Sequence, residues 1–290
     1  MIWIIIGIIS TALDSFSNVI WKKALNYSTL SWSLFQLYWQ YFGLLTVIIL
    51  LLISPFEISI LNNYLDLLFI ILIVIIATFN VIFQINILKK VKLSHLLPYQ
   101  NLDKIFVVII GYFLFLWTES STSIITLLIT ILTMLFVIVF TIDFKKLVFP
   151  ELFWSYLLHK VIKAFCVVAW WYLLIKYTSI TYVIIYSLIQ FFAYNVICII
   201  KKEKFKDLIL QSKSFHVSRS LSSITGRVWW VIWLYLIETS WLIIATLLWF
   251  FAIVVNIISM KYILDDIPSK KQVILAFIVT TMIWLWIYFN

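Results

Sequence analysis

Apolar runs of about 20 residues recur along this 290-residue chain, and each is long enough to cross a bilayer as one helix. The composition agrees, because 65% of the residues are hydrophobic and only 11% are charged. Soluble domains have about 45–50% apolar and about 25% charged residues. The sequence therefore excludes a water-soluble globule and predicts an all-α, polytopic membrane protein.

Polar breaks divide the apolar sequence into ten candidate transmembrane helices. The first five are expected over Ile2–Trp21, Leu30–Ile53, Asp66–Leu88, Leu93–Trp117 and Thr122–Ile142. The second five are expected over Trp154–Ile175, Ile180–Ile200, Phe215–Ile237, Thr239–Leu264 and Gln272–Phe289. They form two five-helix halves, residues 1–147 and 148–290, in one membrane domain. The eighth run contains the polar stretch SRSLSSITGR, so a surface helix and nine spans stay open as an alternative.

Basic residues divide the loops between these helices into two classes. Most of the 21 lysines and arginines lie in the odd-numbered loops: Lys22, Lys23, Lys89, Lys90, Lys92, Lys145, Lys146, Lys201, Lys202, Lys204, Lys206, Lys213, Lys261, Lys270 and Lys271. The even-numbered loops hold one base, Lys176. By the positive-inside rule the lysine-rich loops are cytoplasmic and both termini face outward, in a prokaryotic plasma (inner) membrane. The net charge of +9 then reflects topology and attraction for anionic lipids, and no nucleic-acid partner is expected.

Three segments carry a resemblance to a known family. STALDSFSNVIWKKAL, in the first helix, includes a lysine pair at its end. VKLSHLLPYQNLDKIFVVIIGYFLFLWTESSTSIITLLITIL has an early proline, Pro98, and a glutamate, Glu119, at the turn to the fifth helix. YILDDIPSKKQVILAF repeats this element with Asp265 and Asp266 in the place of the glutamate. These segments resemble the ten-helix, EamA-like branch of the drug/metabolite transporter (DMT) superfamily.

The resemblance implies a fold and a function. The fold is two inverted five-helix repeats, and the function is secondary transport by alternating access. The implied substrates are small metabolites that are often amino-acid-like, amphipathic or drug-like. Members of the family mostly keep their termini in the cytoplasm, whereas the lysine pattern places them outside, so the sidedness stays open.

Polar side chains inside the predicted helices are the candidate site residues, because a charge within a membrane is costly without a partner or water. Helical spacing places Asp14 and Asn18 on one face of the first helix, and His95, Tyr99 and Asp103 on one face of the fourth. The candidates for binding substrate or a coupling proton are Asp14, Asn18, Asn80, Gln84, His95, Tyr99, Asp103, Lys104, Tyr186, Gln190, Arg219, Arg227 and Asn256.

Arg219 and Arg227 carry most of this hypothesis. At mid-depth Arg227 costs at least about 2.5–3.5 kcal/mol unless it is paired or hydrated, and Asp14 or Asp103 is its expected counter-ion. Both arginines suit a carboxylate or phosphate held by bidentate hydrogen bonds. One of the two aspartates is expected to carry a coupling proton.

Other interpretations compete with binding. For the amide side chains, hydrogen bonding between helices is an equal alternative. Lys160 and Lys163 are expected to snorkel from the end of their helix toward the membrane surface. The oligomeric state is open.

Enzyme motifs are weak in this chain. The three histidines lie far apart, without metal-ligand spacing, and no P-loop or G-x-S-x-G motif occurs. Asp265 and Asp266 are similar to the acidic motifs of intramembrane prenyltransferases, but no second acidic cluster is found. The prediction is a secondary transporter, not an enzyme, for a small anionic, zwitterionic or amphipathic organic metabolite, with no metal or cofactor. An intramembrane enzyme or lipid-handling protein acting on a lipid or isoprenoid phosphate stays open as the alternative.

Overall fold

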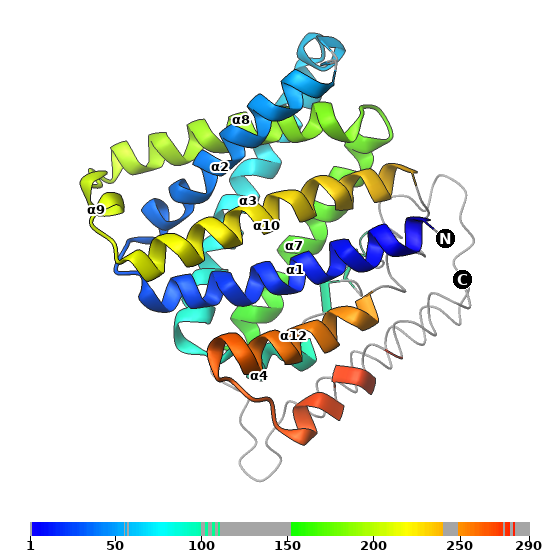
Figure 1. Ribbon diagram of the computed structural model, residues 1–290. Helices are drawn as coiled ribbons and strands as arrows, with labels where there is room; N and C mark the ends of the chain where they lie inside the picture. The colour runs from blue at the N-terminus through cyan, green and yellow to red at the C-terminus, as the bar shows by residue number, and fades with distance from the viewer. Residues whose placement is uncertain are drawn as a thin grey trace.

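The computed structural model describes residues 2–54, 56, 58–99, 102, 103, 106, 107, 110, 152–239, 249–274, 276–278 and 281. Every regular element among these residues is helical (Figure 1). The α-helices are α1 (Ile2–Tyr27), α2 (Trp32–Ile53), α3 (Tyr64–Lys90), α4 (Leu93–Leu96), α7 (Phe153–Leu174), α8 (Ser179–Ile200), α9 (Lys206–Ile209), α10 (Lys213–Thr239) and α12 (Trp249–Leu264). Two short 3-10 helices are η1 (Ile58–Asn62) and η2 (Leu97–Tyr99).

Helices from the two ends of the chain pack against each other. In Figure 1, α1 runs beside α10 and α12, and these are its main neighbours. The other large contacts join α2 to α8 and α3 to α7. Each long helix of the N-terminal half therefore has its main neighbour in the C-terminal half.

The outside of this bundle is apolar, and part of its inside is polar. Phe79 and Phe192, both within long helices, are 60% and 63% exposed, whereas Asp103, Arg219 and Ser223 are completely buried. Such a surface suits lipid and is unfavourable in water. Four described helices, α2, α3, α7 and α8, are long and apolar enough to cross a membrane. The all-helical prediction is confirmed for the described residues, and these features agree with an integral membrane protein.

The first helix is longer than predicted. The sequence predicts an end at Trp21, before the lysine pair, but α1 continues to Tyr27. Lys22 is buried, and its Nζ donates to the carbonyl oxygens of Leu88 and Val91 at the end of α3. A cation at a helix C-terminus is favourable, because the last carbonyl groups carry partial negative charge. These carbonyl oxygens therefore allow the Lys22 side chain to be buried within the bundle.

The predicted fourth helix does not begin as one continuous helix. Its first residues form α4, and the next three form η2 around Pro98. Leu97 keeps a right-handed helical conformation, but its N–H bonds to the Ser94 carbonyl oxygen three residues back, and Pro98 has no N–H to continue the α-helical pattern. The prediction of an unbroken α-helix from Leu93 is therefore wrong here. The predicted fifth helix and most of the tenth lie outside the described residues.

The polar eighth run forms α10, one continuous helix of 27 residues. It packs against α1, α2 and α8, and its Ser222 is fully buried. Ser222 Oγ donates to the Ser17 carbonyl oxygen at 3.1 Å, and Ser17 Oγ donates to the Ser222 carbonyl oxygen at 3.0 Å. These reciprocal bonds join α10 to α1 and favour a helix of the bundle over the alternative of a surface helix.

Two of the chain's four glycines make room for large side chains. A Cβ atom at Gly43 on α2 would lie 2.5 Å from Arg227 Nη2. A Cβ atom at Gly226 on α10 would meet the end of the Trp39 ring and lie 2.7 Å from Ser17 Oγ. These glycines therefore allow α2 and α10 to enclose the Trp39 and Arg227 side chains.

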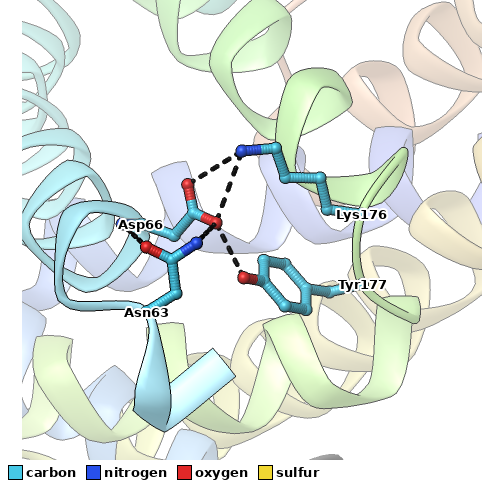
Figure 2. Close-up of polar contacts among 4 residues, drawn as sticks. All are labelled: Asn63, Asp66, Lys176 and Tyr177. Carbon is cyan, nitrogen blue, oxygen red and sulfur yellow. Dashed lines mark hydrogen bonds and ion pairs between the residues drawn. The ribbon is translucent and has the colours of Figure 1, made fainter. Parts of the chain in front are cut away.

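Asp66, in the first turn of α3, connects this helix to the α7–α8 turn (Figure 2). Lys176 Nζ donates to both carboxylate oxygens, at 3.1 and 3.4 Å, and the Tyr177 hydroxyl donates to Oδ2 at 2.7 Å. Asn63 Nδ2 donates to the same Oδ2 at 2.8 Å, and Asn63 Oδ1 accepts from the Asp66 N–H. Lys176, the one base of the even-numbered loops, thus has a carboxylate partner.

Alkaline pH is expected to loosen this cluster. Hydrogen bonds to Tyr172 and Asp66 raise the pKa of Lys176 above its ordinary 10.5, and burial and the bond to Asp66 raise the pKa of Tyr177 above 10.0. Both groups hold their protons more tightly in the folded state. Their contribution to stability is therefore complete below about pH 10 and is lost as the pH rises through the raised pKa values.

Differential scanning fluorimetry in detergent between pH 8 and about pH 12 measures this effect, since the range brackets the ordinary pKa values of both groups. We expect the melting temperature of the wild type to fall more steeply above about pH 10 than that of Asp66→Asn. Parallel curves for the two proteins would contradict the assignment.

Candidate functional site

A partly open cavity of about 310 Å³ lies among α1, α3, α7, α8, α10 and α12. Many of the predicted site residues line it: Asp14, Asn18, Asn80, Gln84, Tyr186, Gln190 and Asn256. These residues come from α1, α3, α8 and α12, so side chains far apart in the sequence meet at one place. The volume is at the lower end of the range for small-molecule sites, about 300–1,000 Å³.

A second cavity, of about 210 Å³, adjoins the first on the side of α2. Asp14, Asn18, Gln84 and Gln190 line both. Asn18 Nδ2 donates to Asp14 Oδ1 at 2.9 Å, one helical turn away. The Asp14 carboxylate therefore lies where a solute in either cavity can reach it.

Asp103 is the centre of a charge cluster beside the larger cavity. Its Oδ1 lies 3.2 Å from Lys160 Nζ, and its Oδ2 lies 3.0 Å from Lys163 Nζ. Both lysines line the cavity, and Lys160 is only 4% exposed. The prediction that these lysines snorkel is wrong for Lys160, because the buried carboxylate offers its ammonium a partner inside the bundle.

His159 and Asn80 form a polar pair on the same cavity wall. His159 Nδ1 lies 2.8 Å from Asn80 Oδ1, and both residues line the larger cavity. An amide oxygen only accepts, so the ring donates from Nδ1 in this contact. The pair joins α7 to α3 where these helices face the cavity.

Arg219 is held against α2 and lines neither cavity. Its Nη2 donates to the Phe35 carbonyl oxygen at 2.9 Å and to Gln36 Oε1 at 3.3 Å. Its guanidinium lies over the Phe35 ring, with 4.0 Å from Cζ to the ring centroid. The Trp39 ring also contacts both arginines, with Cζ of Arg219 at 5.5 Å and Cζ of Arg227 at 5.1 Å from its centroid. Arg219 therefore acts as a contact between α10 and α2.

Arg227 also lines neither cavity, and its hydrogen-bond partners are neutral. Its Nη2 donates to Gln40 Oε1 at 2.8 Å, and its Nη1 donates to Ser187 Oγ at 3.2 Å. The sequence predicted Asp14 or Asp103 as the counter-ion of Arg227, but its guanidinium is hydrogen-bonded to these neutral groups instead. The aspartates are held elsewhere, Asp14 by its own helix and Asp103 by the α7 lysines.

Besides Asp103, Arg219 and Arg227, two further predicted site residues do not line the cavity. His95 is exposed, and Tyr99 packs on Phe153 and Tyr156 with ring centroids 5.9 and 6.4 Å away. Their predicted common face with Asp103 assumed one continuous helix, which η2 interrupts. Lys104 lies outside the described residues.

Several cavity residues were not among the predicted site residues. They are His159, Lys160, Lys163, Trp170 and Trp229. The spacing of His159 and Lys163, four residues apart on one helix, was the available signal. This spacing did not show that the side chains face a cavity, because lysines near a helix end fit snorkelling equally well.

The acidic pair Asp265–Asp266 has structural contacts at the end of α12. Asp265 adopts a left-handed conformation with φ of 52°, and the Asp266 N–H donates to the Met260 carbonyl oxygen at 3.2 Å. Asp266 Oδ2 accepts from the Ser94 N–H, in α4, at 2.9 Å. Within the described ranges, no group of three or more His, Cys, Asp or Glu side chains is placed to share a metal ion.

Comparison of the sequence with protein-family models and with curated proteins finds no match. The cavity and the groups that line it are therefore the basis for assigning a function.

Proposed function

We propose that this protein is a secondary transporter that moves a small anionic, zwitterionic or amphipathic organic metabolite across the membrane by alternating access. The observation that carries the proposal is a cavity with charges of both signs, lying among helices whose outer surface suits lipid. Charged groups inside a membrane helix bundle mark substrate or ion pathways, because their cost must be offset by a function or by a partner.

The cavity wall matches a solute that is both polar and apolar. Asp14 offers an acceptor for an ammonium group or a proton. Lys160 and Lys163, both ion-paired with Asp103, bring ammonium groups to the cavity wall, where an anionic group of the solute can meet them. Trp229 and other aromatic side chains supply apolar wall.

The helix pairing supports two related halves, residues 1–147 and 148–290. If α1, α2 and α3 correspond to α7, α8 and α10, the pair α1–α10 corresponds to α7–α3, and the pair α2–α8 corresponds to itself. A two-fold relation between the halves produces this pattern. Relative rocking of such halves is how inverted-repeat transporters alternate access to a central site.

Uptake into proteoliposomes tests the proposal. The probes are radiolabelled amino acids, small carboxylates and primary amines, each with and without an imposed pH gradient. For any probe that the wild type moves, we expect Asp14→Asn or Lys163→Gln to lower uptake about tenfold, because each change removes a charge-assisted contact in the cavity.

Asp66→Asn is the matched control. It removes one carboxylate charge at the end of α3, away from the cavity, and is expected to change uptake by less than about twofold. A wild type that moves no probe contradicts transport of this solute class. Wild-type rates in both cavity variants contradict the proposed site.

A further inference from the structure

A line of hydrogen bonds runs from Arg227 to the wall of the larger cavity. Arg227 Nη2 donates to Gln40 Oε1 at 2.8 Å, and Gln40 Nε2 donates to Gln190 Oε1 at 3.2 Å. Gln190 Nε2 then donates to the Tyr186 hydroxyl oxygen at 3.0 Å. Gln190 and Tyr186 line the cavity, whereas Arg227 does not. The buried cation is therefore connected to the cavity through three side chains.

The direction of every bond in this line is determined by its cationic end. A guanidinium donates and never accepts, so Gln40 must turn its oxygen toward Arg227. The Gln40 amide nitrogen then faces Gln190, which must offer its oxygen and turn its own nitrogen toward Tyr186. Because the Tyr186 oxygen accepts this bond, its O–H is left to donate in another direction.

The Tyr186 O–H has no acceptor within the described part of the chain, although the residue is only 4% exposed. A second donor lies beside it. The Trp170 indole N–H also lacks an acceptor there, and the Trp170 and Tyr186 rings pack edge to face with centroids 6.0 Å apart. Both residues line the cavity. A buried donor without a partner is costly, so two at one place indicate a missing acceptor.

We infer that Tyr186 and Trp170 form a subsite for an anionic oxygen acceptor, of the carboxylate type, on the transported solute. Each bond in the line polarises the next, so the charge of Arg227 strengthens the Tyr186 donor without touching the ligand. Arg227, Gln40 and Gln190 are positioning residues in this arrangement. The inference rests on the proposed function only in taking the cavity as the place where the solute binds.

Benzoate and benzylammonium are suitable probes, since they share a ring and a similar size but carry opposite charges. Isothermal titration calorimetry of the purified full-length chain in detergent, at matched ionic strength, measures both affinities. Asp14 and Lys163 also face the cavity, so the decisive quantity is the change between wild type and variant for each probe.

Tyr186→Phe keeps the ring and removes the donor. We expect benzoate to bind at least about tenfold more weakly to this variant, the effect of losing one hydrogen bond to a charged group. Benzylammonium has no acceptor for the tyrosine O–H, so its affinity is expected to change by less than about twofold.

Gln40→Glu reverses the line without breaking it. A carboxylate at position 40 still accepts from Arg227 but cannot donate, so Gln190 must turn its nitrogen toward position 40 and its oxygen toward Tyr186. The Tyr186 O–H then donates to Gln190 and is withdrawn from the cavity. We expect benzoate affinity to fall about tenfold again and benzylammonium affinity to stay level or rise.

Gln36→Glu is the matched control, because it places the same charge on α2 beside Arg219, the other buried arginine. Benzoate affinity is expected to stay within about twofold of the wild type. The subsite is overturned if the wild type fails to bind benzoate, if Tyr186→Phe leaves benzoate affinity unchanged, or if Gln40→Glu and Gln36→Glu behave alike. Because binding is measured without flux, probe selectivity in a protein that transports nothing would overturn the proposed function and leave the subsite standing.

Discussion

Asp103→Asn is expected to lower the free energy of unfolding by about 3–5 kcal/mol, since it removes the carboxylate from a buried ion pair and leaves the cation behind. Lys160 is 4% exposed, and the change replaces its charged partner at 3.2 Å by a neutral amide. Asparagine keeps the size of the side chain and removes only its charge. Unfolding by SDS titration in mixed micelles measures the loss.

Two variants separate this effect from a general disturbance of α7. Lys163→Met leaves the pair of Lys160 and Asp103 intact, and the Lys163 side chain is 33% exposed, so the change is expected to cost less than about 1 kcal/mol. Adding Lys160→Met to Asp103→Asn removes the stranded charge and is expected to recover most of the lost stability. Equal losses of unfolding free energy for Asp103→Asn and Lys163→Met would show that Asp103 does not stabilise the protein by pairing with a buried charge.

Gly226→Ala is expected to destabilise the protein by about 1–3 kcal/mol, the usual cost of adding a methyl group to a packed interior. On an exposed helix surface the same change stabilises by about 1 kcal/mol, so its sign reports the packing. The new Cβ atom would meet the Trp39 ring and lie 2.7 Å from Ser17 Oγ. The ring cannot move cheaply, since the guanidinium groups of Arg219 and Arg227 lie against it.

A Trp39→Leu background provides the control for this prediction. Without the ring, Gly226→Ala is expected to cost clearly less, because only the 2.7 Å contact with Ser17 Oγ remains, and thermal melting of the four proteins in this cycle measures the coupling. An equal cost in both backgrounds would place the clash elsewhere.

The sequence predicts the described helices well and their interruptions poorly. The ends of α2, α3, α7 and α8 lie within a few residues of the predicted runs, because bilayer thickness sets the length of an apolar segment. The end of α1 was missed because the partner of Lys22 lies on another helix. Pro98 signalled a break, but a proline early in a helix is also tolerated, so the pattern alone does not choose between the two.

The candidate site was predicted as a set of residues and not as a set of partners. The free-energy cost of a charge inside a membrane pointed to Asp14, Asp103 and Arg227 as site residues. It did not show which residues form pairs. Spacing along one helix found Asp14 with Asn18. It could not find Asp103 with Lys160, 57 residues apart, or Arg227 with Gln40, 187 residues apart. Pairs between helices depend on how the bundle packs, which single-helix periodicity does not contain.

The contact between Gly43 and Arg227 has a consequence for how this chain can diverge. A side chain at position 43 needs the space that the guanidinium occupies. A change to alanine or serine at position 43 therefore requires either a shorter residue at position 227 or a movement of the Arg227 guanidinium, which its hydrogen bonds to Gln40 and Ser187 oppose. Related sequences, as they accumulate, should show these two positions changing as a pair.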